Sequence, residues 1–354
     1  MKKLIDICDI QYGYAFDSAY FTENSCYPPL ARIRDVKRGY SETYYSGGYS
    51  EEYILASGDL LVGMDGEFNI ARWKCDGALL NQRVCRLLAK KGTNEEYLRF
   101  AMMKVLKEIE RRTAFVTVKH LSAKELNKLQ LVVPDLSTQN KVAEILSRLE
   151  KIIGLRRQEL KRLDDLIKAR FVELFGDPRS NPFGFEKKML KDTCKVITGN
   201  TPSRAIAEYY GDYIEWIKTD NIVSGILNPT QATESLSEKG MNVGRTVEKD
   251  SILMACIAGS IASIGRVCIT DRIVAFNQQI NAVVPEQYNI LFLYVLLQMS
   301  KDYLVEDINM ALKGILSKSK LEEKEFIIPP MDLQEQFSDF VKQVNKSKFI
   351  NQLL

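Results

Sequence analysis

The longest periodic run of hydrophobic and polar positions lies near the middle of the chain, at residues 142–174. One set of positions seven residues apart, which starts at Leu146, is apolar throughout. A second set, which starts at Val142, contains apolar residues together with Arg156 and Arg170. The apolar members that would form the seam of a coiled coil are Leu146, Leu149, Ile153, Leu160, Leu163, Ile167 and Leu174. A sustained heptad pattern is typical of a coiled-coil helix. At ~1.5 Å per residue it predicts a rod of about 50 Å, which ends at Gly176-Asp177-Pro178 because proline disfavours helix in the residue before it.

The hydrophobic segments on the two sides of this helix follow the same order. Matching openings at 4–16 and 190–202 align Gly13 with Gly199. An apolar strand led by Asp, a strand that contains Asn-Gln, and a helix then follow in each half. Their ranges are 58–66, 78–88 and 95–110 in the first half, and 249–259, 274–284 and 290–306 in the second. The shared order predicts a tandem duplication.

The closing segments of the two halves match best. Leu121, Leu126, Pro134 and Gln139 pair with Leu316, Leu321, Pro329 and Gln334 at one constant offset. Each closing segment leads into a helix, and Ser122 with Glu125, like Asp332 with Glu335, has the spacing of a capping box. We therefore expect two similar globules, each followed by a helix.

These patterns predict an α+β (mixed) fold, in which two similar α/β domains are separated by a long antiparallel helical coiled coil with pseudo-twofold repeat symmetry. The expected parts are domain 1 at 1–133, the central helix at 134–178, domain 2 at 179–328, and a C-terminal helix at 329–354 that pairs with the central one. The competing interpretation is that the central helix is a solvated linker. The unbroken apolar seam argues against this interpretation, because an apolar seam stabilises a helix only when another surface covers it.

Composition narrows the class of protein. The chain has 354 residues, a net charge of only +3 and no apolar run near the ~18 residues that would span a bilayer. Seven cysteines without a CxxC pair, and a single histidine, favour a reducing compartment and argue against a zinc site. We expect a cytoplasmic protein that has no cofactor, no metal and no membrane partner.

Of three enzyme motifs, two are incomplete and one is absent. Asn181-Pro182-Phe183 lacks the second proline of a DNA-methyltransferase motif, and Leu146 stands where a nuclease motif beginning at Pro134-Asp135 would need lysine. No GxxxxGK[ST] loop exists, so no ATPase is expected. The chain is interpreted as a binding protein.

The two weakly similar domains, the Pro-x4-Gln helix starts and the junction ARFVELFGDPRSNPFGFEKKML resemble the specificity subunit of a type I restriction–modification system. The resemblance is most specific at 131–187 and 326–340. It implies that each target-recognition domain reads one half of a bipartite double-stranded DNA site and that the coiled coil sets the spacing between the halves. It also implies that the helices dock methyltransferase subunits, two in number, and that restriction/translocase subunits join outside them. Catalysis would belong to these partners.

One feature departs from that family, because the C-terminal helix spans about twenty residues after Asp332 against about forty in the central helix. The coil could therefore be partly unpaired, or a methyltransferase subunit could cover the remaining face. The alternative class is a coiled-coil scaffold that joins two protein-interaction domains and does not bind DNA.

Base recognition needs Arg, Lys, Asn, Gln or Ser at loops and helix ends. The candidates in domain 1 are Arg32, Arg34, Lys37, Arg38, Asn69, Arg72, Lys74, Lys119 and His120. The candidates in domain 2 are Thr198, Asn200, Thr201, Arg204, Lys218, Thr219, Asn221, Ser260, Ser263, Arg266 and Lys313. The Arg-x-Arg alternation predicts that Arg32 and Arg34 share one face of a strand, with a solvated strand edge as the alternative. Asn81-Gln82 and Asn277-Gln278 recur in both halves, which favours a structural turn over base contact.

Overall fold

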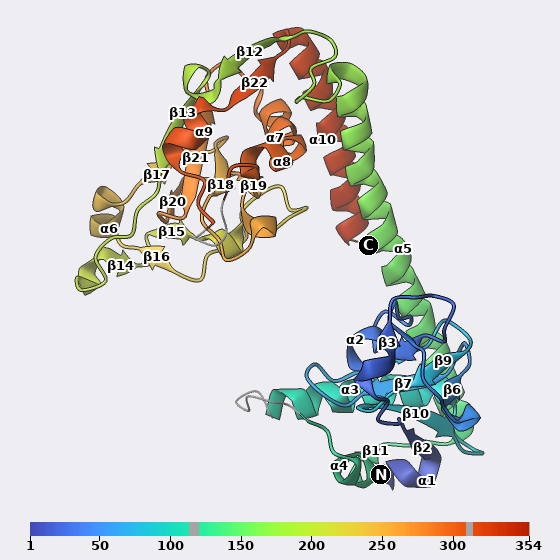
Figure 1. Cartoon of the computed structure of the whole chain (residues 1–354). Coiled ribbons are helices and arrows are strands. Elements are labelled where there is room, and N and C mark those ends of the chain that lie inside the picture. The colour runs from blue at the N-terminus through green and yellow to red at the C-terminus, as the bar shows by residue number, and fades with distance from the viewer. Residues whose placement is uncertain (113–119, 309–313, 354) are drawn as a thin grey trace. The chain divides into compact units, whose positions relative to one another are not determined.

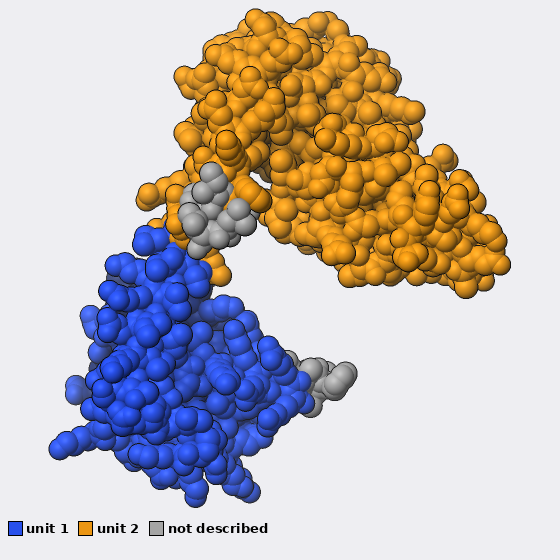
Figure 2. Space-filling view, turned by 180° about the vertical axis from the view of Figure 1, so that it is seen from behind, with its two compact units in different colours: residues 1–155 blue, residues 156–354 orange. Residues whose placement is uncertain are grey.

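The computed structural model describes residues 1–112, 120–308 and 314–353. The chain divides into two compact units, residues 1–155 and 156–354 (Figure 2). Two of the predicted DNA contacts, Lys119 and Lys313, lie outside the described residues. Among the helices of the described ranges, none has the length and apolar character needed to cross a membrane.

The first unit is built on a four-stranded antiparallel sheet (Figure 1). Its strands lie in the order β2 (Cys8–Tyr12), β10 (Val84–Ala89), β7 (Leu60–Gly63) and β8 (Asn69–Arg72). A second sheet has the order β4 (Leu30–Ala31), β9 (Ala78–Leu80) and β6 (Ile54–Leu55), and its β4–β9 pair is parallel. The remaining elements are β1 (Lys2–Lys3), which pairs with β11 (Gln130–Leu131), β3 (Phe21–Thr22), which pairs with β5 (Tyr44–Tyr45), and the helices α1 (Leu4–Ile7), α2 (Ile33–Val36), α3 (Glu95–Arg112) and α4 (Ala123–Lys128). The apolar face of α3 packs on the first sheet through Leu98, Met102 and Leu106.

The second unit repeats this plan. Its main sheet has the order β13 (Cys194–Thr198), β21 (Ile280–Pro285), β18 (Ile252–Ala255) and β19 (Val267–Ile269). A five-stranded sheet has the order β14 (Tyr210–Gly211), β16 (Ser235–Leu236), β15 (Ile214–Ile217), β20 (Val274–Phe276) and β17 (Thr246–Val247), and its β15–β20 pair is parallel. The other elements are β12 (Glu186–Met189), paired with β22 (Glu325–Ile328), and the helices α6 (Glu238–Val243), α7 (Ile290–Met299), α8 (Lys301–Val305) and α9 (Lys318–Glu323). The matching strand orders confirm the duplicated α+β fold.

Two predicted elements are divided in the structure. Each strand expected to contain Asn-Gln is really two strands joined by a turn, β9–β10 in the first unit and β20–β21 in the second. Asn81 and Asn277 are buried in these turns. A Cβ added to Gly13 would lie 2.1 Å from the carbonyl oxygen of Asn81, and one on Gly199 would lie 2.1 Å from that of Asn277. A glycine at each position therefore leaves the space that the turn needs. The helix expected at 290–306 is likewise two helices, α7 and α8, which meet at Ser300.

The glutamine shared by the two closing segments makes the same hydrogen bonds twice. Gln139 Oε1 accepts from the backbone N–H of Asn94 at 2.9 Å, and its Nε2 donates to the carbonyl of Pro134 at 2.8 Å. Gln334 bonds Asn289 and Pro329 at the same two distances. Both amides are buried, so each ties the start of a long helix to the start of the helix that covers the sheet.

These two long helices are α5 (Leu136–Phe175) and α10 (Met331–Leu353). α5 ends where predicted, with Gly176 at φ 70 and its N–H bonded to the carbonyl of Val172. Ser122 caps α4 as a capping box, but the second capping box is wrong, because α10 begins at Met331 and Asp332 already lies inside its first turn.

In the second unit α10 runs antiparallel beside the C-terminal part of α5 (Figure 1), as predicted. Lys348 pairs with Asp164, whereas Phe337 near the start of α10 packs edge-on against Phe171 at 5.6 Å between ring centroids. Arg170, one of the two cations in the heptad pattern, lies over the ring of Phe340 and pairs with Glu173. This part of α5 is a paired helix and not a solvated linker.

The coiled-coil seam is covered over only part of α5. Ile167 is buried and Leu163 and Leu174 pack against the same apolar cluster, which includes residues of α10. In the first unit, Leu149 is 49% exposed and Ile153 is 51% exposed, and Ile145 and Ile152 are more than half exposed beside them. At about 100° per residue these four side chains fall within one face of the helix. We call them the bare stripe.

Candidate nucleic-acid interface

In the first unit four of the predicted cations, Arg32, Arg34, Lys37 and Arg38, lie in or beside the short helix α2. Arg32 is the residue that precedes α2, and Arg34 lies inside the helix. The prediction that the two arginines alternate along a strand is therefore wrong. The helix forms because Asp35, three residues after Arg32, accepts from the backbone N–H of Arg32 at 3.3 Å and closes a capping box.

The carboxylate of Asp35 is fully buried and binds two cations. Its Oδ2 accepts from Arg32 Nε at 3.1 Å and from Ser41 Oγ at 3.1 Å, and its Oδ1 accepts from Arg38. The Arg38 guanidinium also stacks over the ring of Tyr40, 5.0 Å from its centroid. The carboxylate raises the pKa of Arg38 chiefly through the hydrogen bond between them. Both arginines therefore have their guanidinium groups fixed in one orientation.

The other candidates near α2, Lys37, Asn69 and Lys74, differ in the contacts that their side chains make. Lys74 donates to the carbonyl of Arg38 at 2.7 Å, and Lys37 pairs with Glu67 at the surface. Asn69 lies in strand β8 and not in a loop as predicted, and its Nδ2 donates to the carbonyl of Glu67 at 3.0 Å. The loop between β7 and β8 contributes Glu67, whose carboxylate lowers the positive charge of this surface.

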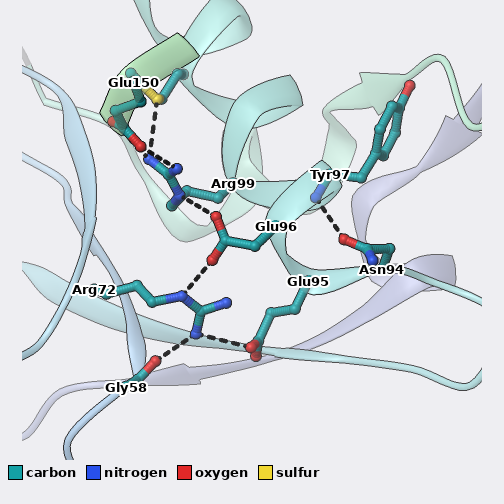
Figure 3. Close-up of polar contacts among 9 residues, drawn as sticks. Gly58, Arg72, Asn94, Glu95, Glu96, Tyr97, Arg99 and Glu150 are labelled. Atoms are coloured by element: carbon teal, nitrogen blue, oxygen red, sulfur yellow. Dashed lines mark hydrogen bonds and ion pairs between the residues drawn. The ribbon is translucent and has the colours of Figure 1, made fainter. Parts of the chain in front are cut away.

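Arg72 belongs to a chain of charges that runs from β8 through α3 to α5 (Figure 3). Its guanidinium binds the carbonyl of Gly58 and pairs with Glu95 and Glu96. Glu96 also pairs with Arg99, and the buried Arg99 reaches Glu150 on α5 with contacts of 2.6 and 3.2 Å. Arg72 is thus committed to holding β8, α3 and α5 together.

Burial raises the pKa of Glu96, but the hydrogen bonds from Arg99 and Arg72 together outweigh burial, so the pKa of Glu96 is lowered on balance. The carboxylate is therefore ionised in the folded protein at neutral pH.

His120 pairs with Asp65, which lies in the loop between β7 and β8. Its ring contacts the carboxylate of Asp65 and the guanidinium of Arg83, which also approaches Asp65 at 3.5 Å. Arg83 has φ 68, an uncommon conformation for a non-glycine residue. His120 thus contacts Asp65 beside a surface arginine, Arg83, that was not predicted from the sequence.

In the second unit two predicted cations meet at one carboxylate that was not predicted. Glu234 pairs with Lys218 and with Arg204, the latter at 2.6 Å. Both cations lie over the ring of Trp216, and Arg204 also lies over Tyr210 at 4.5 Å. The hydrogen bond from Lys218 is the main cause that lowers the pKa of Glu234.

The other candidates of the second unit fall into two groups by their hydrogen-bond partners. Arg266 donates to the carbonyls of Ser263 and Thr219, both at 3.2 Å, and Ser260 donates to Ser263. The second group consists of residues whose polar atoms bond within the unit. Thr198 donates to Asn281, Asn200 donates to the carbonyl of Val243, Thr201 donates to Gln278, and Asn221 accepts from the backbone N–H of Lys218.

Strand register shows which positions correspond in the two units. Ala31 pairs with Leu80 in one parallel pair and Ile217 with Phe276 in the other, so Arg32 and Lys218 occupy the same place. Val62 pairs with Ile70, and Met254 pairs with Val267. Asn69 and Arg266, which each precede one of these residues, are therefore equivalent as well. The same positions thus carry different polar side chains.

The carboxylates that orient these cations were not predicted from the sequence. The spacing of Asp35, three residues after Arg32 and three before Arg38, is a signal that could have revealed its role. Glu234 lies sixteen residues after Lys218, and only the pairing of β15 with β16 brings them together.

A duplicated α+β fold with cationic loops at equivalent places defines a protein with two related binding sites. The family model described as type I restriction modification DNA specificity domain matches residues 1–164 and 182–354. The chain belongs to this family and contains two of its domains. Recognition of a DNA target is the general role of the family.

Relatives of known class support the same conclusion. The chain is 27% identical over 371 residues to the type I restriction enzyme EcoBI specificity subunit of Escherichia coli, a match that covers 96% of this chain and 77% of that protein. It is 30% identical to the HindI specificity subunit of Haemophilus influenzae over 43% of this chain and 37% of that protein. It is 25% identical to the MjaIX specificity subunit of Methanocaldococcus jannaschii over 77% of this chain and 67% of that protein.

Solved structures show the same fold. The S subunit of a type I restriction–modification system from M. genitalium matches with a TM-score of 0.60 at 13% identity, over 99% of this chain and 90% of that one. A chain from a structure on complex assembly and conformational transition of the type I system matches with a TM-score of 0.51 at 16% identity, with the same coverage. The chain is a specificity subunit of this family, the non-catalytic class of subunit in type I systems, and it is not an enzyme.

Proposed function

We propose that this protein selects a bipartite double-stranded DNA site and that each domain binds one half of it. The observation that carries the proposal is the equivalence of Arg32 with Lys218 and of Asn69 with Arg266. Two readers of different half-sites need a common scaffold with different polar groups at the same places. The two units have this arrangement.

The side chains suit direct recognition of bases. Arginine and lysine pair with the O6 and N7 acceptors of guanine, and asparagine pairs with adenine. The predicted contacts of both domains, apart from the structurally engaged Arg72, stand as proposals, with Arg32 and Arg38 foremost in the first and Lys218 and Arg204 foremost in the second. The net charge of +3 is small, so discrimination depends on these local groups more than on general attraction to phosphate.

The two long helices serve spacing and assembly in this proposal. We assign the recognition domains to 1–133 and 179–328 and the helical parts to 134–178 and 329–354. The forty residues of α5 extend about 60 Å at ~1.5 Å per residue. A helix of this length would fix the number of unread base pairs between the half-sites.

We propose further that the bare stripe docks a methyltransferase subunit. Ile145, Leu149, Ile152 and Ile153 continue the face that α10 covers elsewhere on α5, and an exposed apolar stripe of this kind marks a protein contact. A complex with two methyltransferase subunits and with restriction/translocase subunits would supply the catalytic steps. It would act in the cytoplasm, where all seven cysteines, which are free here, stay reduced.

Filter binding of the chain with its methyltransferase partner to DNA duplexes tests the proposal. We expect tight binding only to duplexes with both half-sites at the correct spacing, and weak binding after either half is replaced. Binding that ignores sequence, or no binding at all, would favour a scaffold that joins two protein-interaction domains.

A further inference from the structure

Each recognition domain holds two cations against one carboxylate, and at least one of the two lies over an aromatic ring. In the first, Asp35 binds Arg32 and Arg38, and Arg38 stacks on Tyr40. In the second, Glu234 binds Lys218 and Arg204, and both cations lie over Trp216. We call these two arrangements the carboxylate clamps.

The clamps are not a simple inheritance from the duplication. The residue equivalent to Asp35 is Asn221, which accepts from the backbone N–H of Lys218 at 2.9 Å as Asp35 does from that of Arg32. Asn221 carries no charge, and its side-chain nitrogen is engaged by Thr230 and Gln231. The charge that fixes the second pair of cations comes instead from Glu234, beside strand β16. Two unrelated segments thus produce the same arrangement in the two domains.

Fixing these cations has two physical consequences. A free arginine or lysine on a loop samples many rotamers, and binding must restrict them, whereas a clamped side chain is already ordered. The carboxylate also offsets part of the positive charge, which weakens sequence-independent attraction to phosphates. Both effects favour discrimination between bases over affinity for any DNA.

We propose that Asp35 and Glu234 are positioning residues for base recognition, one in each domain. They do so by holding Arg32 with Arg38, and Lys218 with Arg204, in the orientation that meets the base edges. This inference rests on the proposed function, in which each domain reads one half-site.

The test is methylome sequencing of host strains in which the chromosomal gene carries Glu234→Gln or Asp35→Asn. We expect Glu234→Gln to reduce discrimination about tenfold at one or two base pairs of one half-site, since a good bidentate contact distinguishes bases by roughly that factor or more. The other half-site should stay unchanged. Asp35→Asn should relax the opposite half-site.

Three controls separate positioning from stability. Glu208→Gln removes another exposed carboxylate of the second unit, which pairs with Lys239, and should leave both half-sites unchanged. Glu234→Asp keeps the charge and should restore most of the discrimination. Glu234 is also 35% exposed in its side chain, so its neutral variant should fold even if Asp35→Asn, at a fully buried site, does not.

The outcomes separate this inference from the proposed function. A wild-type strain whose methylated sites are not bipartite would overturn the proposed function. A bipartite wild-type pattern that Glu234→Gln leaves unchanged, or weakens equally at every site, would overturn the positioning role alone. Relaxation confined to one half-site supports both.

Discussion

Replacing the buried Gln139 with methionine should destabilise the first unit and leave the second unaffected. Methionine has a similar volume, so the change removes hydrogen bonds with little change in packing. The bonds lost are those to the N–H of Asn94 and to the carbonyls of Pro134 and Gly92, at 2.9, 2.8 and 3.2 Å. The matched change Gln334→Met should do the same to the second unit.

The magnitude follows from the groups left without partners. A buried donor or acceptor that loses its partner costs about 1–3 kcal/mol, and water can reach part of this site, so we expect a loss of about 2–4 kcal/mol. For a unit of this size each kcal/mol lowers Tm by about 2–4 °C. The exposed Gln158 lies on the same helix, and Gln158→Met should change stability by less than about 0.5 kcal/mol.

The two tryptophans of the chain provide the assay, because Trp73 is buried in the first unit and Trp216 in the second. Urea unfolding followed by Trp73 fluorescence, in a Trp216→Phe background, reports the first unit alone. The reciprocal background reports the second. The reasoning fails if Gln139→Met leaves the Trp73 transition in place, or if it shifts the Trp216 transition as much.

Three further predictions concern the helix α5 and the charges bound to it. Ile153→Lys should weaken association with the methyltransferase subunit at least about tenfold, because it places a charge in an apolar contact. The control Lys151→Ala should leave this association unchanged. Equal pull-down of the methyltransferase subunit by both variants would contradict docking at the bare stripe. Deleting the seven residues 156–162 removes about 10 Å of helix, which corresponds to roughly three base pairs of DNA. Methylome sequencing should therefore show a shorter gap between the half-sites or no methylation. An unchanged gap would show that α5 does not set the spacing. Because the pKa of Glu96 is lowered in the folded state, its stabilising contribution is complete above its ordinary value of 4.5 and is lost as the pH falls through the lower folded value. Glu96→Gln should therefore destabilise the first unit by about 1–2 kcal/mol at neutral pH, and by progressively less below pH 4.5 in urea titrations; a constant difference would refute this.

The duplication and the coiled coil were predictable because they depend on local sequence. Gln139 and Gln334 have the same neighbours in sequence because their amides make the same bonds in the structure. The heptad seam likewise predicted that the central helix is paired, and the duplication predicted that its partner runs antiparallel, but neither could show that Leu149 and Ile153 lie exposed. Exposure depends on what packs against α5, which the periodicity of α5 alone does not contain.

The candidate site was less predictable, since it depends on contacts between distant segments. Arg32 and Arg34 look like alternating strand residues until the carboxylate of Asp35 caps a helix that starts after Arg32 and contains Arg34. Arg72 looks like a free cation until α3 brings Glu95 and Glu96 against it. Residue type and local spacing therefore identified most cations of the site but not their partners.

The central claim, that each domain reads its own half of the target, is tested most directly by exchanging residues 185–315 for the same segment of a relative and sequencing the methylome. The account predicts that one half-site changes to that of the relative while the other half-site and the gap are kept. A change in both half-sites, or in neither, would contradict it.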